Sequence, residues 1–169
     1  PKTYLANKNE YYENRWFASE FDRSSDTINI LNQKIPFGAD LIFENSNDKN
    51  FRFGIEICED LWAIKSPNID LALSNCIAIF NLSASNEYLG KSEIREDYIK
   101  VLSQKLNLAY IYANAGIYES TTDTVFSGTS YIYENGKLLK KSNSFSFENE
   151  ICIADIDTEI LRSERLKNS

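Results

Sequence analysis

The sequence predicts an α/β domain with a mixed β-sheet and helices on one of its faces. Residues 51–57 alternate loosely and are rich in β-formers, residues 76–82 form a continuous apolar run, and 109–114 is a further predicted strand. Between the last two, residues 90–106 repeat apolar side chains at helical spacing. Residues 129–133 and 137–141 flank Asn135-Gly136, which predicts a hairpin with a type I′ turn. A hairpin added to parallel strands makes the predicted sheet mixed.

Composition limits the classes of function. With 169 residues, 43% of them hydrophobic, the chain can bury the core of one domain or of part of one. The net charge of −7 argues against nucleic acid or an anionic membrane as the main partner. No apolar run is long enough to span a membrane and no signal peptide is recognisable. We therefore expect a cytoplasmic protein, with its three unpaired cysteines reduced.

The remaining elements follow from local signals. Ser66-Pro67 opens a helix through Leu73, with Ser66 as N-cap. The helix at 90–106 has Ser92 as a candidate cap. Its expected apolar face consists of Ile94, Tyr98, Val101, Leu102 and Leu106. A helix is predicted at 158–166.

The other segments are predicted to be short strands, turns and loops. We expect a strand end and an irregular loop within 1–23, a short strand within 24–33, a turn at 35–38, a strand at 40–43, a hairpin loop at 45–50 and a last strand at 150–155. Cys76 and Cys152 fall in apolar strands and are expected in the core. The aromatic set Tyr11, Tyr12, Trp16 and Phe17 is expected to serve packing.

The strand at 51–57 ends abruptly at Cys58. Glu59 and Asp60 follow, and carboxylates favour the first turn of a helix. A cysteine at such a junction can point its sulfur into a cleft lined by backbone N–H groups. The alternative from the residues alone is a small buried cysteine at the end of a strand.

The absence of histidine restricts the chemistry that Cys58 could perform. A Cys-His or Ser-His-Asp triad cannot be assembled within this chain, and histidine metal sites are excluded. Since Glu56, Glu59 and Asp60 disfavour a nearby thiolate, a reactive cysteine needs a cation and a base from elsewhere. Lysine is the obvious cation, because it can also stabilise an oxyanion.

Several motifs occur in an order that identifies a family. They are KTYL at 2–5, NEYYE at 9–13, RWF at 15–17, PFG at 36–38, GIEICEDLW at 54–62, NLSAS at 81–85, ESTTDTVFSG at 119–128 and ADIDTEILRSER at 154–165. Together they resemble the nitrilase (carbon–nitrogen hydrolase) superfamily and, more closely, the glutaminase domain of glutamine-dependent NAD synthetases. The resemblance implies a nitrilase-like α-β-β-α sandwich. The chain starts at Pro1 and lacks Met, so we expect residues 1–169 to be the C-terminal part of that domain.

The superfamily uses a Glu-Lys-Cys triad, and the resemblance carries it over motif by motif. Cys58 matches the nucleophile, and Lys2 matches the lysine that stabilises the oxyanion together with the Glu59 N–H. The general-base glutamate is expected on a strand before Lys2. Glu10 matches a second glutamate near the lysine and is expected to orient it; the alternative is a salt bridge within the loop.

For substrate, the resemblance implies glutamine. Glu59 would meet its α-amino group, Ser85 would hold its amino-acid end and Lys91 would bind its carboxylate. The alternatives are a loop cap for Ser85 and a solvated helix start for Lys91. Ala6 replaces the usual proline of the KTYLP motif, and the ESTTD loop could be a set of backbone caps.

The resemblance also implies partners outside this segment. Ammonia would pass to a synthetase domain of the same chain, which uses ATP and magnesium, within a homo-oligomer. No cofactor or metal is expected in residues 1–169. The alternatives are a free-standing nitrilase-like amidase acting on another small amide, and an inactive piece serving in assembly. We expect the isolated chain to have little or no activity.

Overall fold

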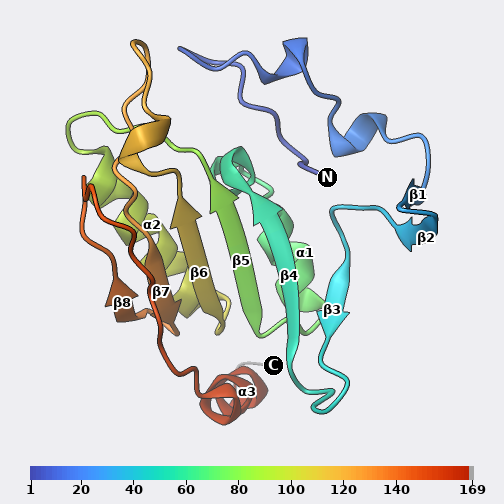
Figure 1. Cartoon of the computed structure of the whole chain (residues 1–169). Helices are drawn as coiled ribbons and strands as arrows, with labels where there is room; N and C mark the ends of the chain where they lie inside the picture. Colours follow the sequence, from blue (N-terminus) through green and yellow to red (C-terminus); the bar gives the residue numbers. More distant parts are fainter. Residues whose placement is uncertain (168–169) are drawn as a thin grey trace.

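The computed structural model describes residues 1–167, and a six-stranded mixed sheet dominates it (Figure 1). The strands follow one another across the sheet in chain order. They are β3 (Ile42–Glu44), β4 (Arg52–Ile57), β5 (Ala78–Ser83), β6 (Ala109–Asn114), β7 (Tyr131–Glu134) and β8 (Lys137–Lys141). The pairs β4/β5 and β5/β6 are parallel, and the outer pairs are antiparallel. The predicted mixed sheet is therefore confirmed.

The hairpin between β7 and β8 turns at Asn135-Gly136, as predicted. Both residues have positive φ, 44° and 80°, which a type I′ turn requires. The loop at 45–50 likewise joins antiparallel neighbours, β3 and β4. The two parallel crossovers place the carboxyl ends of β4, β5 and β6 at the same edge of the sheet, where ligands commonly bind in α/β folds.

Two helices cover one face of the sheet, behind the strands in Figure 1. They are α1 (Pro67–Leu73) and α2 (Lys91–Lys105), and a third helix, α3 (Thr158–Lys167), lies near the lower end of the sheet. The core between helices and sheet consists of Leu61, Leu71, Cys76, Ile79, Ile99, Leu108, Tyr110, Tyr112, Tyr131 and Tyr133. Helices on one face were predicted, and the structure confirms them.

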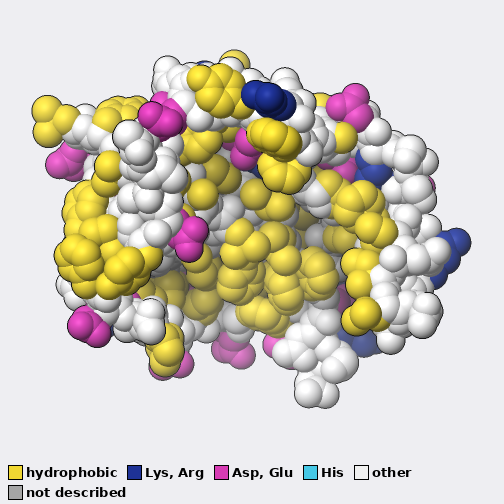
Figure 2. Space-filling view, turned by 45° about the horizontal axis from the view of Figure 1, so that its top comes forward, with side chains coloured by type: hydrophobic (Ala, Val, Ile, Leu, Met, Phe, Trp, Pro, Cys, Tyr) yellow, Lys and Arg dark blue, Asp and Glu magenta, His cyan; other side chains and the backbone are white. Residues whose placement is uncertain are grey.

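The opposite face of the sheet leaves apolar side chains accessible. Phe43 and Leu82 are 41% and 56% exposed, and Phe80 and Ile111 are half-buried. Leu161 of α3 covers only the lower part of this face, against Ala78 and Ala109. Figure 2 shows the resulting apolar surface in the middle of the molecule.

The predicted buried face of α2 is partly confirmed, since Leu102 and Leu106 pack against the core. Arg95, Ile99 and Ser103 are fully buried, whereas Ile94 and Val101 are each 57% exposed. Hydrophobic spacing missed the rest of this face because the helix also buries Arg95, which forms an ion pair with Glu87. The N-cap is Gly90, with φ of 82°, and not Ser92.

Three segments differ from their predicted conformation. Residues 150–155 form no strand, although they alternate in polarity, because no strand edge pairs with them; Ile151 and Ile153 are 83% and 78% exposed. The predicted turn at 35–38 begins as strand β2 (Gln33–Pro36), antiparallel to β1 (Thr27–Ile30). Residues 1–23 contain 3₁₀ turns at Glu13–Arg15 and Glu20–Asp22 but no strand.

The cysteines are free thiols. Cys76 is buried as predicted, but Cys152 is only half-buried and lies outside any strand. The N-terminal aromatic residues were expected to pack in the interior. This is wrong for Tyr12, Trp16 and Phe17, which are 65–72% exposed. Within residues 1–167, none of the helices is both long enough and apolar enough to cross a membrane.

Candidate active site

Cys58 lies where β4 ends and a 3₁₀ helix, Cys58–Trp62, begins. Its φ of 51° falls in the left-handed region, which is costly for a residue with a Cβ and is concentrated at functional sites. Its backbone N–H donates to Asn81 Oδ1 on β5 at 3.3 Å. The predicted strand-to-helix junction therefore exists, as a sharp turn with the cysteine at its apex.

Cys58 opens into a cleft of about 270 Å³ at the carboxyl end of the parallel strands. Four of the six predicted site residues line it together, namely Cys58, Glu59, Ser85 and Lys91. The other lining residues are Ala6, Lys8, Asn9, Tyr11, Trp62, Asn86, Tyr88 and Ile94. The cleft thus has one acidic side chain and two basic ones around a thiol.

Lys91 forms the basic side of the cleft. Its Nζ donates to Asn86 Oδ1 at 2.5 Å and lies 5.0 Å from the centre of the Tyr88 ring. Burial, and to a lesser degree the charge of Arg95, lowers the pKa of Lys91. An anionic group entering the cleft would meet a partly desolvated ammonium here, where the interaction is stronger than in water.

Glu10 belongs to the same network. Its carboxylate accepts a hydrogen bond from Asn86 Nδ2, and Asn86 N donates to the hydroxyl of Tyr11 at 2.9 Å. The Tyr11 hydroxyl itself donates to Ala84 O at 3.0 Å, and burial raises the pKa of Tyr11 to about 12. Glu10 therefore supports Asn86, which holds Lys91.

Lys2 is held by Glu13, a residue that the sequence interpretation did not single out. Its Nζ donates to both carboxylate oxygens of Glu13, at 2.7 and 2.5 Å. Glu13 Oε2 also accepts from Ala6 N at 2.7 Å. The expectation that Glu10 contacts Lys2 is therefore not met. Both glutamates lie in the NEYYE motif, and only the 3₁₀ turn at Glu13–Arg15 decides which of them faces the lysine.

Asp60 is a second residue that the sequence interpretation missed. It is 1% exposed, and its Oδ1 accepts from Thr3 N and Tyr4 N at 3.0 and 2.7 Å. Its Oδ2 accepts from Ile57 N at 3.0 Å. Burial raises the pKa of Asp60, against these backbone hydrogen bonds and the charge of Lys2. One carboxylate thus connects the segment after Lys2 to the turn that carries Cys58.

Glu59 and Ser85 complete the predicted set. Glu59 Oε1 pairs with the exposed Lys8 Nζ at 2.8 Å. Ser85 is 4% exposed, and its backbone N–H and C=O both bond the side chain of Asn114, at 2.8 and 3.0 Å. The strand β6 therefore fixes Ser85 through an asparagine at its end. In the ESTTD loop, the Ser120 and Thr121 hydroxyls cap nearby backbone N–H groups, as expected.

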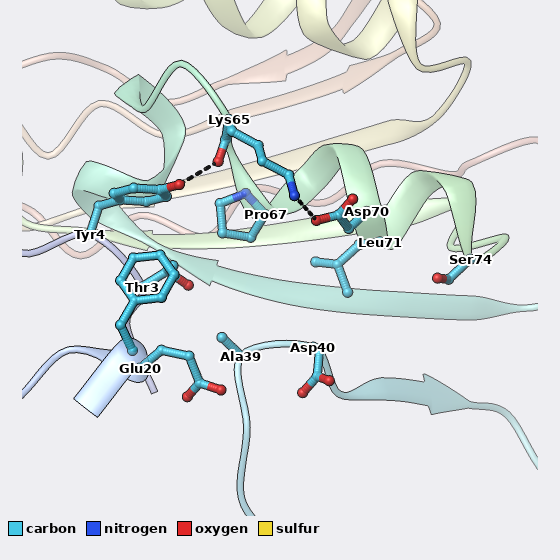
Figure 3. A pocket seen from close by; sticks show the side chains of 11 residues that line it. Thr3, Tyr4, Glu20, Ala39, Asp40, Lys65, Pro67, Asp70, Leu71 and Ser74 are labelled. Atoms are coloured by element: carbon cyan, nitrogen blue, oxygen red, sulfur yellow. Dashed lines mark hydrogen bonds and ion pairs between the residues drawn. The ribbon is translucent and has the colours of Figure 1, made fainter. Parts of the chain in front are cut away.

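A second cleft, of about 330 Å³, lies between the N-terminal segment, the chain before β3 and α1 (Figure 3). Tyr4 donates its hydroxyl proton to Lys65 O at 2.9 Å, and the Lys65 ammonium pairs with Asp70 at 3.5 Å. None of the six predicted site residues lines this cleft. Residues 1–167 also contain no group of three His, Cys, Asp or Glu side chains placed to hold a metal ion.

Comparisons with known proteins bear on the fold and on the relatives of the chain. No family model matches the chain. Among solved structures, a glutamine-dependent NAD(+) synthetase from Cytophaga hutchinsonii superposes with a TM-score of 0.73 and 32% identity, over 88% of this chain and 23% of that one. A carbon–nitrogen hydrolase from Helicobacter pylori G27 gives a TM-score of 0.69 at 19% identity, over 98% of this chain and 54% of that one. The chain therefore has a fold of the nitrilase superfamily.

The sequence comparison identifies relatives that share a single name. The glutamine-dependent NAD(+) synthetase of Mycobacterium tuberculosis H37Rv is 40% identical over 167 residues, which are 99% of this chain and 24% of the relative. The human protein of the same name is 30% identical over 180 aligned residues, 100% of this chain and 25% of the relative. The chain thus spans about a quarter of the length of these relatives. Over nearly its whole length, the chain is therefore similar to one segment of glutamine-dependent NAD(+) synthetases.

Proposed function

We propose that this chain is the glutamine-hydrolysing part of a glutamine-dependent NAD synthetase. The observation that carries the proposal is the cleft in which Cys58, at the apex of a strained turn, shares one space with Glu59 and Lys91. A free amino acid presents an ammonium and a carboxylate, and the two side chains offer one opposite charge to each. Ser85, fixed by Asn114, would hold the same end of glutamine.

The proposed reaction proceeds through a thioester. Cys58 Sγ attacks the side-chain amide carbon of glutamine while a glutamate base takes the thiol proton. The Lys2 ammonium and the Glu59 N–H stabilise the oxyanion, and the C–N bond breaks as ammonia leaves with that proton. Water, deprotonated by the same base, then attacks the thioester, releasing glutamate and restoring the thiol. Support for Lys2 comes from Asp60 and Glu13, which tie its segment to the Cys58 turn and hold its ammonium.

The base and a second sheet are proposed to come from a segment before Lys2. In this proposal, residues 1–169 form one sheet layer of an α-β-β-α sandwich, and another sheet packs on the open face of β4–β6. Support comes from the apolar side chains on that face, among them Phe43 and Leu82 (Figure 2). Covering such a surface is strongly favourable.

The released ammonia is proposed to serve a synthetase domain of the same chain, which amidates deamido-NAD with ATP and magnesium. The named relatives, which are glutamine-dependent NAD(+) synthetases about four times as long as the matched segment, support this. We further propose a cytoplasmic homo-oligomer. The free thiols of all three cysteines are compatible with a reducing compartment.

The test compares the full-length gene product with its Cys58→Ala variant. We expect the variant to lose glutamine hydrolysis and glutamine-dependent NAD formation while NAD formation from added ammonium salt continues. Residues 1–169 expressed alone should release little or no ammonia from glutamine. Glutamine hydrolysis that survives Cys58→Ala would overturn the proposal, and turnover by the isolated chain at the full-length rate would refute the external base.

A further inference from the structure

A buried carboxylate that the proposed mechanism does not use lies beneath the Cys58 turn. Glu56 is 1% exposed and projects from β4 toward the helix-covered side of the sheet. Around it lie the polar side chains of Ser66, Asn68, Asn81 and Tyr110, all 0–3% exposed. Polar clusters with so little access to water are costly unless every member is hydrogen-bonded.

Every partner that the structure gives Glu56 is neutral and donates to it. Asn68 Nδ2 donates at 3.0 Å, the Ser66 hydroxyl at 3.1 Å and Asn81 Nδ2 at 3.2 Å. The Tyr110 hydroxyl donates as well. Ser66 is the N-cap residue of α1, but its hydroxyl does not cap the helix. The Ser66 hydroxyl therefore donates to Glu56 and does not accept a hydrogen bond from a backbone N–H of α1.

An uncompensated carboxylate is an expensive way to fill this space. Burial raises the pKa of Glu56, and a glutamine would occupy nearly the same volume without a charge. Buried ionisable groups without a charged partner are often associated with function. What distinguishes a carboxylate from an amide here is that the ionised form only accepts hydrogen bonds.

Asn81 connects this carboxylate to Cys58. Its Nδ2 donates to Glu56 at 3.2 Å and to the Tyr110 hydroxyl at 3.1 Å. Its Oδ1 therefore faces the other way, where it accepts the Cys58 N–H at 3.3 Å and the Ser83 hydroxyl at 2.6 Å. The N–H that Asn81 holds belongs to the residue with φ of 51°.

We propose that Glu56 is a positioning residue for Cys58, acting through the side-chain amide of Asn81. As an acceptor, Glu56 fixes the Asn81 amide with its oxygen toward Cys58, and this hydrogen bond stabilises the left-handed turn that presents the thiol to the cleft. With glutamine at position 56, the Asn81 amide can turn over and point its NH₂ group at the Cys58 N–H. Two donors would then face each other, and the turn would relax. The effect of Glu56 on catalysis rests on the proposed function, glutamine hydrolysis by Cys58.

The test uses Glu56→Gln in the full-length gene product. We expect kcat for glutamine hydrolysis to fall about tenfold or more, since small misplacements of a nucleophile are costly, with KM changed less than about threefold. The rate of Cys58 alkylation by iodoacetamide, measured relative to Cys152 in the same chain, should fall as well. This ratio needs no glutamine, so it reports on the position of Cys58 even if the proposed substrate is wrong.

Ser103→Ala is the matched control. Ser103 is fully buried and bonds Leu108 O at 2.7 Å and Gly136 N at 3.2 Å, far along the chain from Cys58. Its loss should lower stability without changing kcat or the alkylation ratio of the folded protein.

If Glu56→Gln does not fold, Tyr110→Phe decides, because it removes one hydroxyl that bonds both Glu56 and Asn81. The inference is overturned if folded Glu56→Gln has a kcat within about twofold of wild type and an unchanged alkylation ratio. If Glu56→Gln does not fold, the same result for folded Tyr110→Phe overturns it. Hydrolysis that persists in Cys58→Ala refutes the proposed function instead.

Discussion

Glu56 and Asp60 lie two residues to either side of Cys58, and both are 1% exposed, yet different kinds of partner hold their carboxylates. Glu56 accepts hydrogen bonds from neutral side chains of the sheet and of α1. Asp60 accepts from backbone N–H groups, two of which belong to the segment directly after Lys2. The first carboxylate therefore supports the turn from within the domain, and the second ties a distant segment to it.

This difference indicates separate contributions to one site. In this account Glu56 acts on the conformation of Cys58 through Asn81, and not on Lys2. Asp60 acts on the distance between Cys58 and Lys2, because it bonds Ile57 N on one side and Thr3 N and Tyr4 N on the other. Substitutions at the two positions should consequently change different properties of the protein.

The largest effect is expected for Asp60→Asn. The new Nδ2 group would face one or more backbone N–H donors, and leaving these unpaired should lower the free energy of unfolding by about 1–3 kcal/mol. Release of the Lys2 segment should lower kcat for glutamine about 100-fold. Urea unfolding and steady-state kinetics measure both.

Asp70→Asn is the matched control, since Asp70 is exposed and pairs loosely with Lys65 at 3.5 Å. It should change the unfolding free energy by less than about 0.5 kcal/mol. Equal effects of the two substitutions would refute the role given to Asp60.

A smaller effect is expected for Glu13→Gln, which removes the charge that holds Lys2. We expect kcat to fall about tenfold with little change in KM, because Lys2 loses its charged hydrogen bonds. Glu10→Gln should act on KM instead, since Glu10 supports Asn86 and through it Lys91. The reverse pattern would restore Glu10 as the partner of Lys2.

Lys91→Ala should raise KM for glutamine about tenfold while kcat changes less, since a charged hydrogen bond to the substrate carboxylate is lost. Lys100→Ala, exposed on the same helix, is the control. Burial and the charge of Arg95 lower the pKa of Lys91, so its ammonium loses its proton at a lower pH than an ordinary lysine does. The wild-type KM for glutamine should therefore begin to rise at that lower pH. A KM that is flat with pH in the wild type, or unchanged in Lys91→Ala, contradicts the assignment.

The smallest effect concerns stability and pH at Glu56. Burial raises its pKa above the ordinary 4.5, so the folded protein retains a proton that the unfolded chain releases. The contribution of this carboxyl is full below about pH 4.5 and is lost as the pH rises through the folded-state pKa.

Glu56→Gln should not show this loss, so the difference in unfolding free energy between variant and wild type should shift in favour of the variant as the pH rises. The exposed Glu159→Gln is the control. A difference between Glu56→Gln and wild type that does not vary with pH would show that Glu56 does not titrate in this window.

The mixed sheet, the position of Cys58 and three further residues of its cleft, Glu59, Ser85 and Lys91, could be predicted from the sequence. These depend on local signals: a strand that ends at one residue, an Asn-Gly turn and recognisable motifs. The partners of Asp60 could not be predicted in this way, because Thr3 and Tyr4 lie more than fifty residues away from it. In the sequence Asp60 is only an acid in a first helical turn.

Two of the wrong predictions, the buried face of α2 and the partner of Lys2, have similar causes. Hydrophobic spacing identifies only part of the buried face of α2, Leu102 and Leu106, since that face also includes Arg95 and its ion pair with Glu87. The choice between Glu10 and Glu13 depends on an irregular segment with no periodic pattern. In each case a tertiary contact between polar groups decided the result.

The most direct test of the account is covalent labelling of Cys58 by a glutamine analogue that carries an electrophilic diazoketone in place of the side-chain amide. Peptide mass spectrometry of the full-length gene product should find the label on Cys58 and not on Cys76 or Cys152. Excess glutamine should prevent labelling, and hydrolytic activity should fall in proportion to the label. Labelling of another cysteine, or full activity after complete labelling of Cys58, would contradict the central claim that Cys58 is the nucleophile of a glutamine site.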